Sequence, residues 1–265
     1  MDATPLPLSP PVHPVVHHVM PWYPLKWLKQ GLGVLRKAPI SGLFYGVAFV
    51  LMGYFLVYYF SAAPHIVITL STLFLLAGPF LAIGFYDITK QMEGSTGSVP
   101  IRVSLFHSMM AWRSNIQGFS LYAVLLAVIV FTWFRISLLM FALFYDTATL
   151  TSLSHLLRDA LLPSNRLFLL VYFGVGFFFA LLVFASSVIA LPMLLDKEVD
   201  TVTAVITSIQ AVVKNALTML VWAALVVVLC VFGFATYYVG LVITAPLVGF
   251  ATWYAYRDLV SYPSP

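Results

Sequence analysis

The sequence predicts an all-α, polytopic membrane protein with six transmembrane helices. Four long apolar blocks contain no Asp, Glu, Lys or Arg, and they lie at Ala38–Tyr86, Ser114–Phe134, Leu167–Leu195 and Asn215–Tyr256. The hydrocarbon core of a bilayer is about 30 Å thick and takes about 20 apolar residues for each helical crossing. The blocks of 49 and 42 residues therefore each hold two crossings and a turn, and the blocks of 21 and 29 residues hold one crossing each.

Composition supports this class. The chain of 265 residues is 62% hydrophobic and only 8% charged, whereas soluble domains carry about 25% charged residues. The net charge of +4 comes from Lys and Arg near predicted helix ends, which indicates membrane anchoring rather than a nucleic-acid surface. The only cysteine, Cys230, excludes a disulfide framework and a CxxC metal site.

The elements follow in a simple order. Residues 1–24 contain seven prolines and are predicted to form a disordered cytoplasmic tail. Residues 25–260 form the membrane domain. Pro64 suits the first turn of the second crossing. The six crossings are expected at about 40–60, 66–86, 119–134, 167–191, 216–231 and 237–256.

The charges between the crossings predict the orientation. Ten Lys and Arg residues fall on one side of this topology, and three fall on the other, namely Arg135, Arg158 and Arg166. Because Lys and Arg concentrate on the cytoplasmic side, both termini are expected in the cytoplasm. We place Arg135 at the outer rim, with the third crossing ending just before it, since a central Arg costs about 2.5–3.5 kcal/mol.

Three amphipathic segments precede the first, third and fifth crossings. Their apolar residues recur at helical spacing and begin at Leu25, Ile101 and Val202. Such helices lie in the membrane interface. The chain therefore reads as three parallel repeats of an interfacial helix and a transmembrane hairpin. The repeats cover about 25–93, 98–200 and 201–260, and they permit a pseudo-threefold arrangement about the membrane normal.

The second helix of each predicted hairpin carries a proline and is followed by acids. The prolines are Pro79, Pro192 and Pro246, and the acids are Asp87, Asp196, Asp200 and Asp258. If the repeats pack in a ring, these acids lie near the bases that open the repeats, which are Arg36, Arg113 and Lys214. The acids could line a gate or an ion path, or they could form interfacial ion pairs. The prolines could expose carbonyls to a solute or merely kink packed helices.

A second cluster lies in the tail. His13, His17 and His18 are spaced so that their imidazoles could meet at one Cu or Zn ion. No Cys or paired carboxylate completes this site, so an ordinary polar tail is the other interpretation. The sequence predicts no cofactor.

Several stretches carry a family resemblance. They are Gly78–Gly84, Trp112–Asn115, Leu191–Asp196, Asp200–Ala204 and Thr252–Asp258. The chain is similar in them to a family of bacterial integral membrane proteins catalogued as a domain of unknown function, number 2189. Some members are labelled cytochrome c oxidase proteins. Relatives often carry histidines where this chain has Phe250 and Tyr254.

The oxidase label can be tested on the histidines. A haem-copper catalytic subunit ligates its haem and copper with histidines inside the membrane. The six histidines of this chain all fall outside the predicted crossings, so the chain is not expected to be that subunit or an enzyme. The leading hypothesis is a non-enzymatic accessory, assembly or interaction protein in the lipid bilayer, near another membrane protein or a respiratory complex. The alternative is a carrier for an uncharged or amphipathic solute.

Overall fold

The computed structural model describes residues 14–62, 64–94, 103–144 and 166–262, without the side-chain surroundings of most residues from 56 to 80. The predicted all-α class is confirmed, and two short strands pair with each other. The helices are α1 (Tyr23–Lys37), α2 (Pro39–Ala62), α3 (Pro64–Glu93), α4 (Leu105–Met109), the 3-10 helix η1 (Ala111–Asn115), α5 (Ile116–Phe144), α7 (Arg166–Ser187), α8 (Ala190–Asp196), α9 (Thr201–Lys214), α10 (Ala216–Ala235) and α11 (Leu241–Leu259). The strands are β1 (Val15–Val16) and β2 (Val260–Ser261).

Local sequence signals explain the helix boundaries. Ala38 separates α1 from α2, and the helix axis bends by 106° between them. The break falls here because the residue before a proline is disfavoured in helical conformation. Pro39 and Pro64 begin α2 and α3, where a missing N–H costs nothing. Asp200 caps α9 by accepting a hydrogen bond from the backbone N–H of Thr203 at 2.9 Å.

Within the described residues, three helical segments are long and apolar enough to cross a membrane. They are Ala111–Phe144, Arg166–Asp196 and Ala216–Ala235, and the bent pair of α1 with Pro39–Phe55 makes a fourth if it counts as one span. The structure therefore contains three to four candidate spans, fewer than the six that the sequence predicts. Helices do occupy all six expected stretches, but α11 carries Arg257 and Asp258 in its last turn.

The helices pack in a recurring pattern. α3, α8 and α11, which end the three expected repeats, contact one another. α1 packs against α11, α4 against α3, and α9 against α7 and α8. Each predicted interfacial helix thus lies on the last helix of the preceding repeat, and α1 closes the series on α11. The buried core includes Trp27 of α1 and Trp222 of α10, whose rings lie 5.8 Å apart.

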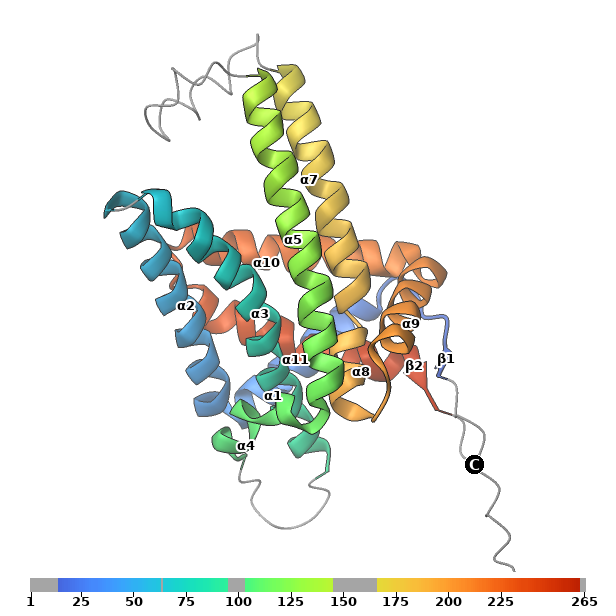
Figure 1. Cartoon of the computed structure of the whole chain (residues 1–265). Helices are drawn as coiled ribbons and strands as arrows, with labels where there is room; N and C mark the ends of the chain where they lie inside the picture. The colour runs from blue at the N-terminus through green and yellow to red at the C-terminus, as the bar shows by residue number, and fades with distance from the viewer. Residues whose placement is uncertain (1–13, 63, 95–102, 145–165, 263–265) are drawn as a thin grey trace, which may run out of the picture.

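The three hairpins differ in direction. Figure 1 shows α5 and α7 side by side and upright, whereas α10 runs across the view behind their lower half. α2 and α3 lean to one side of this pair, and α11 packs on both of them. This differs from the parallel bundle that the repeats predict. Contacts between the hairpins concentrate on α3, α8 and α11, and the tip of the α10–α11 hairpin also meets α2, where the Tyr54 and Tyr238 rings lie 5.8 Å apart.

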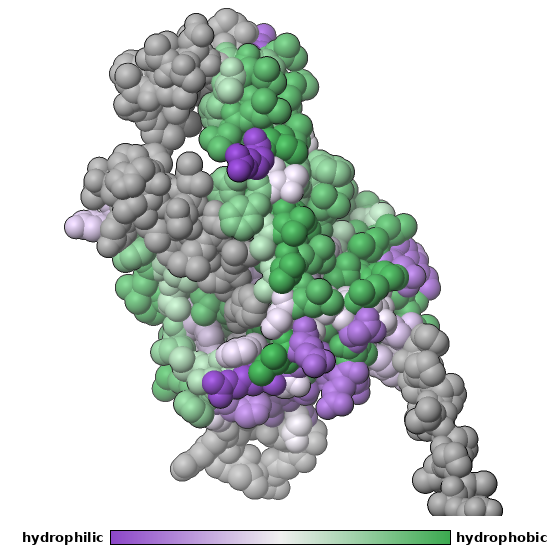
Figure 2. Space-filling model, viewed as in Figure 1, coloured by the Kyte–Doolittle hydropathy of each residue, from purple (hydrophilic) through white to green (hydrophobic). Residues whose placement is uncertain are grey.

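Helix α9 buries its small and polar residues and exposes several apolar ones, as expected for a helix of a membrane protein. Its buried face consists of small and polar residues, including Ala204, Ser208 and Ala211, each with an exposed fraction of 0%. Its apolar residues point outward, and Val213 is 71% exposed. Figure 2 shows apolar residues covering most of the described surface, with polar residues gathered in its lower part. An outward apolar face is favourable where the solvent is hydrocarbon rather than water.

The expected tail is ordered in its second half. Val15 and Val16 pair with Ser261 and Val260, and the backbone N–H of Val19 donates to Asn215 at 2.8 Å. Residues 14–22 therefore lie against the chain terminus and the start of α10, where the sequence predicts disorder through Pro24. Backbone groups that cannot enter a helix at prolines are satisfied here by strand pairing and side chains.

The third crossing is also longer than expected. α5 continues through Arg135 to Phe144, so the helix does not end before the arginine. Nothing in this segment breaks a helix, because Ile136–Phe144 contains no Pro or Gly. Arg135 is exposed partway along an apolar helix.

Candidate functional site

Four charged residues, Lys90, Glu93, Asp196 and Arg257, gather where α3, α8 and α11 meet. Asp196, at the end of α8, accepts a hydrogen bond from the Tyr256 hydroxyl at 2.9 Å, and Arg257 lies 3.5 Å from the same oxygen. Lys90 of α3 lies 3.5 Å from the other Asp196 oxygen and donates to the Leu195 carbonyl at 2.9 Å. A cation at the C-terminus of a helix also interacts favourably with the helix dipole. This junction joins all three helices.

Further groups extend the junction. Arg257 Nε lies 3.2 Å from a Glu93 oxygen, so one guanidinium links α11 to both α3 and α8. Lys197 lies over the Tyr262 ring at 5.3 Å. Burial raises the pKa of the Tyr262 hydroxyl to about 12, so it stays protonated near neutral pH.

Asp258 fixes α1 to α11. Its carboxylate accepts hydrogen bonds from Lys26 Nζ at 2.8 and 3.1 Å and from the Trp27 indole N–H at 2.8 Å. The Trp27 side chain is fully buried, so its N–H needs a partner. The acid therefore holds the amphipathic α1 in place.

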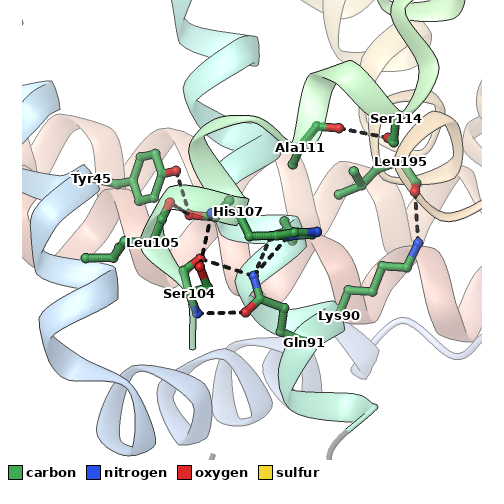
Figure 3. A network of polar contacts seen from close by, with 11 residues as sticks. Tyr45, Lys90, Gln91, Ser104, Leu105, His107, Ala111, Ser114 and Leu195 are labelled. Atoms are coloured by element: carbon green, nitrogen blue, oxygen red, sulfur yellow. Dashed lines mark hydrogen bonds and ion pairs between the residues drawn. The ribbon is translucent and has the colours of Figure 1, made fainter. Parts of the chain in front are cut away.

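Asp87 makes the corresponding link between α3 and α4. Its side chain is 4% exposed, and Oδ2 lies 2.9 Å from His107 Nδ1. Gln91 Nε2 donates to the same oxygen at 2.6 Å, and Gln91 Oε1 accepts from the Ser104 N–H at 2.9 Å. Figure 3 shows Gln91, Ser104 and His107 facing one another. Tyr45 of α2 adds a hydrogen bond to Ser108 at 2.9 Å.

The described ion pairs join the acids to cations other than Arg36, Arg113 and Lys214. Arg36 is exposed at the end of α1, Arg113 lies over the Trp112 ring at 5.5 Å, and Lys214 donates to the Val16 carbonyl at 2.6 Å. The acids pair instead with Lys26, Lys90, His107 and Arg257. The interfacial helices pack on the neighbouring repeat with their middle and first turns, so bases at their last turns point away from the acids.

Asp200 has a local role. It is exposed and caps α9, and hydrogen bonds from the Thr203 side chain and backbone hold the pKa of Asp200 below its usual value. It is separate from the Asp196 junction.

The freed backbone carbonyl beside one of the prolines is covered by a neighbouring helix. Pro246 has no N–H, so the Val242 carbonyl one turn earlier has no helical partner. Gly46 of α2 lies directly against this carbonyl, and a side chain there would collide with it. Pro79 lies inside α3, and Pro192 lies in the buried first turn of α8.

The break between α7 and α8 is closed by a serine from α9. Ser208 Oγ accepts a hydrogen bond from the Ile189 N–H at 3.1 Å and donates to the Ala185 carbonyl at 2.6 Å. The hydroxyl thus replaces the direct helical bond between residues 189 and 185. Ser208 has an exposed fraction of 0%.

Ser208→Ala is therefore expected to lower the free energy of unfolding by about 2 kcal/mol, because it leaves a buried donor and a buried acceptor unpaired. Titration of the purified protein with denaturing detergent measures this change. Ser114→Ala is the control, since that hydroxyl bonds only to the Ala111 carbonyl three residues earlier. An equal effect of both substitutions would contradict the bridging role.

One cavity lies among apolar helices. It has a volume of about 540 Å³ and lies between α2, α3, α10 and α11. Most of its lining side chains are apolar, and the lining includes Phe49, Met52, Phe85, Leu241, Val248 and Cys230. The hydroxyl of Thr252 in the same lining donates to the Val248 carbonyl at 2.8 Å. The lining of this cavity therefore contains no charged side chain.

The tail histidines do not come together as a described metal site. His13 lies outside the described residues, His17 Nε2 bonds to Ser261 Oγ at 2.6 Å, and His18 is exposed. Among residues 14–262 with their gaps, no three His, Cys, Asp or Glu side chains are grouped to hold a metal ion.

Sequence reasoning missed Lys26, Lys90, Tyr256, Ser208 and Asn215. Lys90 and Asp87 stand three residues apart on one helix, and this spacing was an available signal that the end of α3 is a charged contact surface. No sequence signal identified Ser208 or Asn215, because their partners are backbone groups brought close only by folding.

Comparison with known proteins finds one family that part of the chain resembles. The model of a family described as "Predicted integral membrane protein (DUF2189)" matches residues 66–196. No curated protein and no solved structure matches the chain.

Proposed function

Since residues 66–196 match the model of this family of predicted integral membrane proteins, we propose that the protein is a non-enzymatic interaction or assembly protein that contacts its partner through the α5–α7 hairpin. Pairs of small residues four apart stand beside the prolines, among them Ser186 with Ala190 and Ala245 with Gly249, and such pairs and the interfacial helices are the contacts that the sequence suggests. In the structure Ser186 and Ala190 are buried, and Gly249 lies against Phe85. The α5–α7 hairpin, with its exposed apolar residues, is the surface that we assign to a partner instead.

The length of α5 carries the proposal. Its 29 residues span about 43 Å at 1.5 Å per residue, whereas the hydrocarbon core is about 30 Å thick. Even a tilt of about 40°, the upper end of the usual range, leaves a span of about 33 Å. The helix is thus longer than one crossing needs.

Arg135 makes this excess length costly in lipid alone. If α5 stands upright from the inner edge of the hydrocarbon core, Arg135 reaches the outer edge of that core, and the apolar residues after it extend beyond it into the polar headgroup region. Leu139 and Leu143 are then exposed to water at 57% and 71%. If the hairpin tilts to cover them, Arg135 enters the hydrocarbon, at up to about 2.5–3.5 kcal/mol. A protein partner at the hairpin tip relieves both costs.

The hairpin is also preorganised. The Trp133 ring of α5 lies 5.4 Å from the Tyr172 ring of α7, and the Phe141 ring lies 5.2 Å from the Phe168 ring. Ser137 and Tyr172 share a hydrogen bond at 3.1 Å. These contacts hold the two helices together, so a partner would not have to pay for ordering them.

A pull-down in mild detergent tests the proposal. Wild-type protein is expected to retain a membrane partner, and Leu139→Ala with Leu143→Ala to lower its recovery at least about tenfold, since two buried anchors are removed. Leu217→Ala with Leu220→Ala is the control, because these α10 leucines are similarly exposed, at 62% and 57%. The haem absorbance of the co-purified material tests whether the partner belongs to a respiratory complex. Absence of any partner, or equal loss in both variants, would sink the proposal.

We propose further that six helices cross a bacterial inner membrane in three units, with both termini cytoplasmic. The cyclic packing of α1, α4 and α9 on α11, α3 and the α7–α8 pair supports three units. The pairing of β1 with β2 supports termini on one side. This topology is tested by placing a single cysteine at Val239, between α10 and α11, and labelling intact cells with a membrane-impermeant thiol reagent. The cysteine is expected to react. If it does not react, α10 and α11 do not both cross the membrane.

The cavity favours a second candidate, the carrier for an uncharged or amphipathic solute. It adjoins α11, which Pro246 interrupts. A carrier requires this space to open to water, so Cys230 in the lining should react with a membrane-impermeant thiol reagent. The apolar lining and the covered Val242 carbonyl favour the interaction protein, in which Cys230 stays unreactive.

A further inference from the structure

The cavity between the α2–α3 and α10–α11 pairs is elongated. Its lining on α11 runs from Leu241 to Thr252, a rise of about 16 Å at 1.5 Å per residue. Gly53 and Tyr238 are at one end of the lining, and Tyr86 and Thr252 are at the other. A volume of about 540 Å³ lies within the range of ligand sites. The shape suits a chain-like occupant better than a compact one.

Water is a poor occupant of this space. A buried water needs two to four polar partners, and the lining is formed mainly by Phe, Met, Leu, Val and Ala side chains. Thr252 already donates to the Val248 carbonyl. Apolar cavities of this kind stay dry, and an empty one forfeits dispersion contacts along all of its walls.

The cavity is continuous with the lipid-facing surface. Phe234 of α10 belongs to the lining and is 56% exposed, while Met52 of α2 is half-buried. Leu51, next to Met52, is 63% exposed, and Val231 on α10 is 58% exposed. The space therefore opens between apolar side chains that face the bilayer, and the molecules outside this opening are lipids.

We propose that this cavity binds one acyl chain of a bilayer phospholipid, which enters from the side between α2 and α10. The chain fills the dry space along α11 and replaces the missing dispersion contacts. The headgroup stays outside, because the lining carries no charge to bind it. The bound chain then acts as a wedge that completes the packing between the two helix pairs.

Photo-crosslinking in nanodiscs tests the site. The probe is phosphatidylethanolamine with a diazirine on one acyl chain, and adducts are mapped by peptide mass spectrometry. Adducts are expected to concentrate on residues 230–252, and Ala245→Phe, which fills the cavity from α11, should reduce them about tenfold. Ala224→Phe is the control, since Ala224 is exposed on the neighbouring helix α10 and does not line the cavity.

A second variant protects the test against misfolding. Ala82→Phe fills the cavity from α3, and Ala82 belongs to the lining. Thermal melting of each variant first verifies that it folds. Adducts that spread evenly over exposed helices, or that persist in whichever cavity-filling variant folds, would show ordinary surface lipid and overturn the site. Failure of the partner pull-down leaves this result unaffected, because the hairpin tip and the cavity share no residue.

Discussion

Gly46→Ala is expected to lower the free energy of unfolding by about 2–3 kcal/mol, a large loss for the addition of one methyl group. In a Gly46→Ala protein the new Cβ would collide with the backbone of Val242, including its carbonyl oxygen. Backbone atoms cannot move aside as a flexible side-chain end can. Relief therefore requires α2 and α11 to separate, although they pack closely along their length.

The clash expected in Gly46→Ala arises from the way the Val242 carbonyl is covered in the wild-type protein. Pro246 removes the helical donor for this carbonyl, and Gly46 brings the α2 backbone directly against it. Such close approach permits a weak Cα–H···O contact and is the usual role of small residues between membrane helices. A side chain at position 46 removes both benefits.

Denaturing-detergent titration of the purified variants measures the effect. Gly174→Ala in α7 is the matched control, because a Cβ there meets no atom within 4 Å. This control should be neutral or stabilising, since Ala favours helix over Gly by about 1 kcal/mol. If Gly46→Ala is as stable as Gly174→Ala, the close contact of α2 with Val242 is wrong.

Asn215→Ala is expected to cost about 2–3 kcal/mol and to release the ordered N-terminal segment. The side chain is 3% exposed. Its Oδ1 accepts from the Val19 N–H at 2.8 Å, and its Nδ2 donates to the His17 carbonyl at 2.9 Å and the Ala211 carbonyl at 3.2 Å. Removing the amide leaves the Val19 N–H and the His17 carbonyl without this partner, at about 1–3 kcal/mol for each group that water cannot reach, whereas the Ala211 carbonyl keeps its bond from the backbone N–H of residue 215.

The neighbouring contacts show what this amide holds. Lys214 donates to the Val16 carbonyl at 2.6 Å, and Thr218 donates to the Val19 carbonyl at 3.2 Å. Residues 14–22 thereby connect the start of the chain to α9 and α10. Loss of the central amide should loosen the whole segment.

Limited proteolysis and detergent titration together check this result. Cleavage within residues 14–22 should accelerate at least about tenfold, which corresponds to a local loss of about 1.4 kcal/mol. Gln210→Ala is the control, because Gln210 carries the same amide on α9 and is exposed. Unchanged cleavage in Asn215→Ala would show that the segment is held by other contacts.

The sequence predicted the helices better than their partners. Amphipathic spacing located the helices that became α1 and α9, and the charge-free blocks located the long apolar helices, because both signals depend only on local periodicity. The acids at the ends of α3, α8 and α11 were identified, but their cations were not. Which of several nearby bases meets Asp196 depends on the rotation of each helix, and Lys90 and Arg257 reach it only after α3, α8 and α11 meet.

Composition and spacing by themselves determined that this chain is an all-α integral membrane protein. A charge-free block of 49 residues has no other favourable solvent than lipid, whatever the tertiary arrangement. Only the tertiary structure decided that Ser208 closes the break before α8, that Gly46 covers Val242, and that residues 14–22 pack against Asn215. In each case the partner is a backbone group, which has the same chemistry at every residue, so sequence spacing carries no information about which one is met.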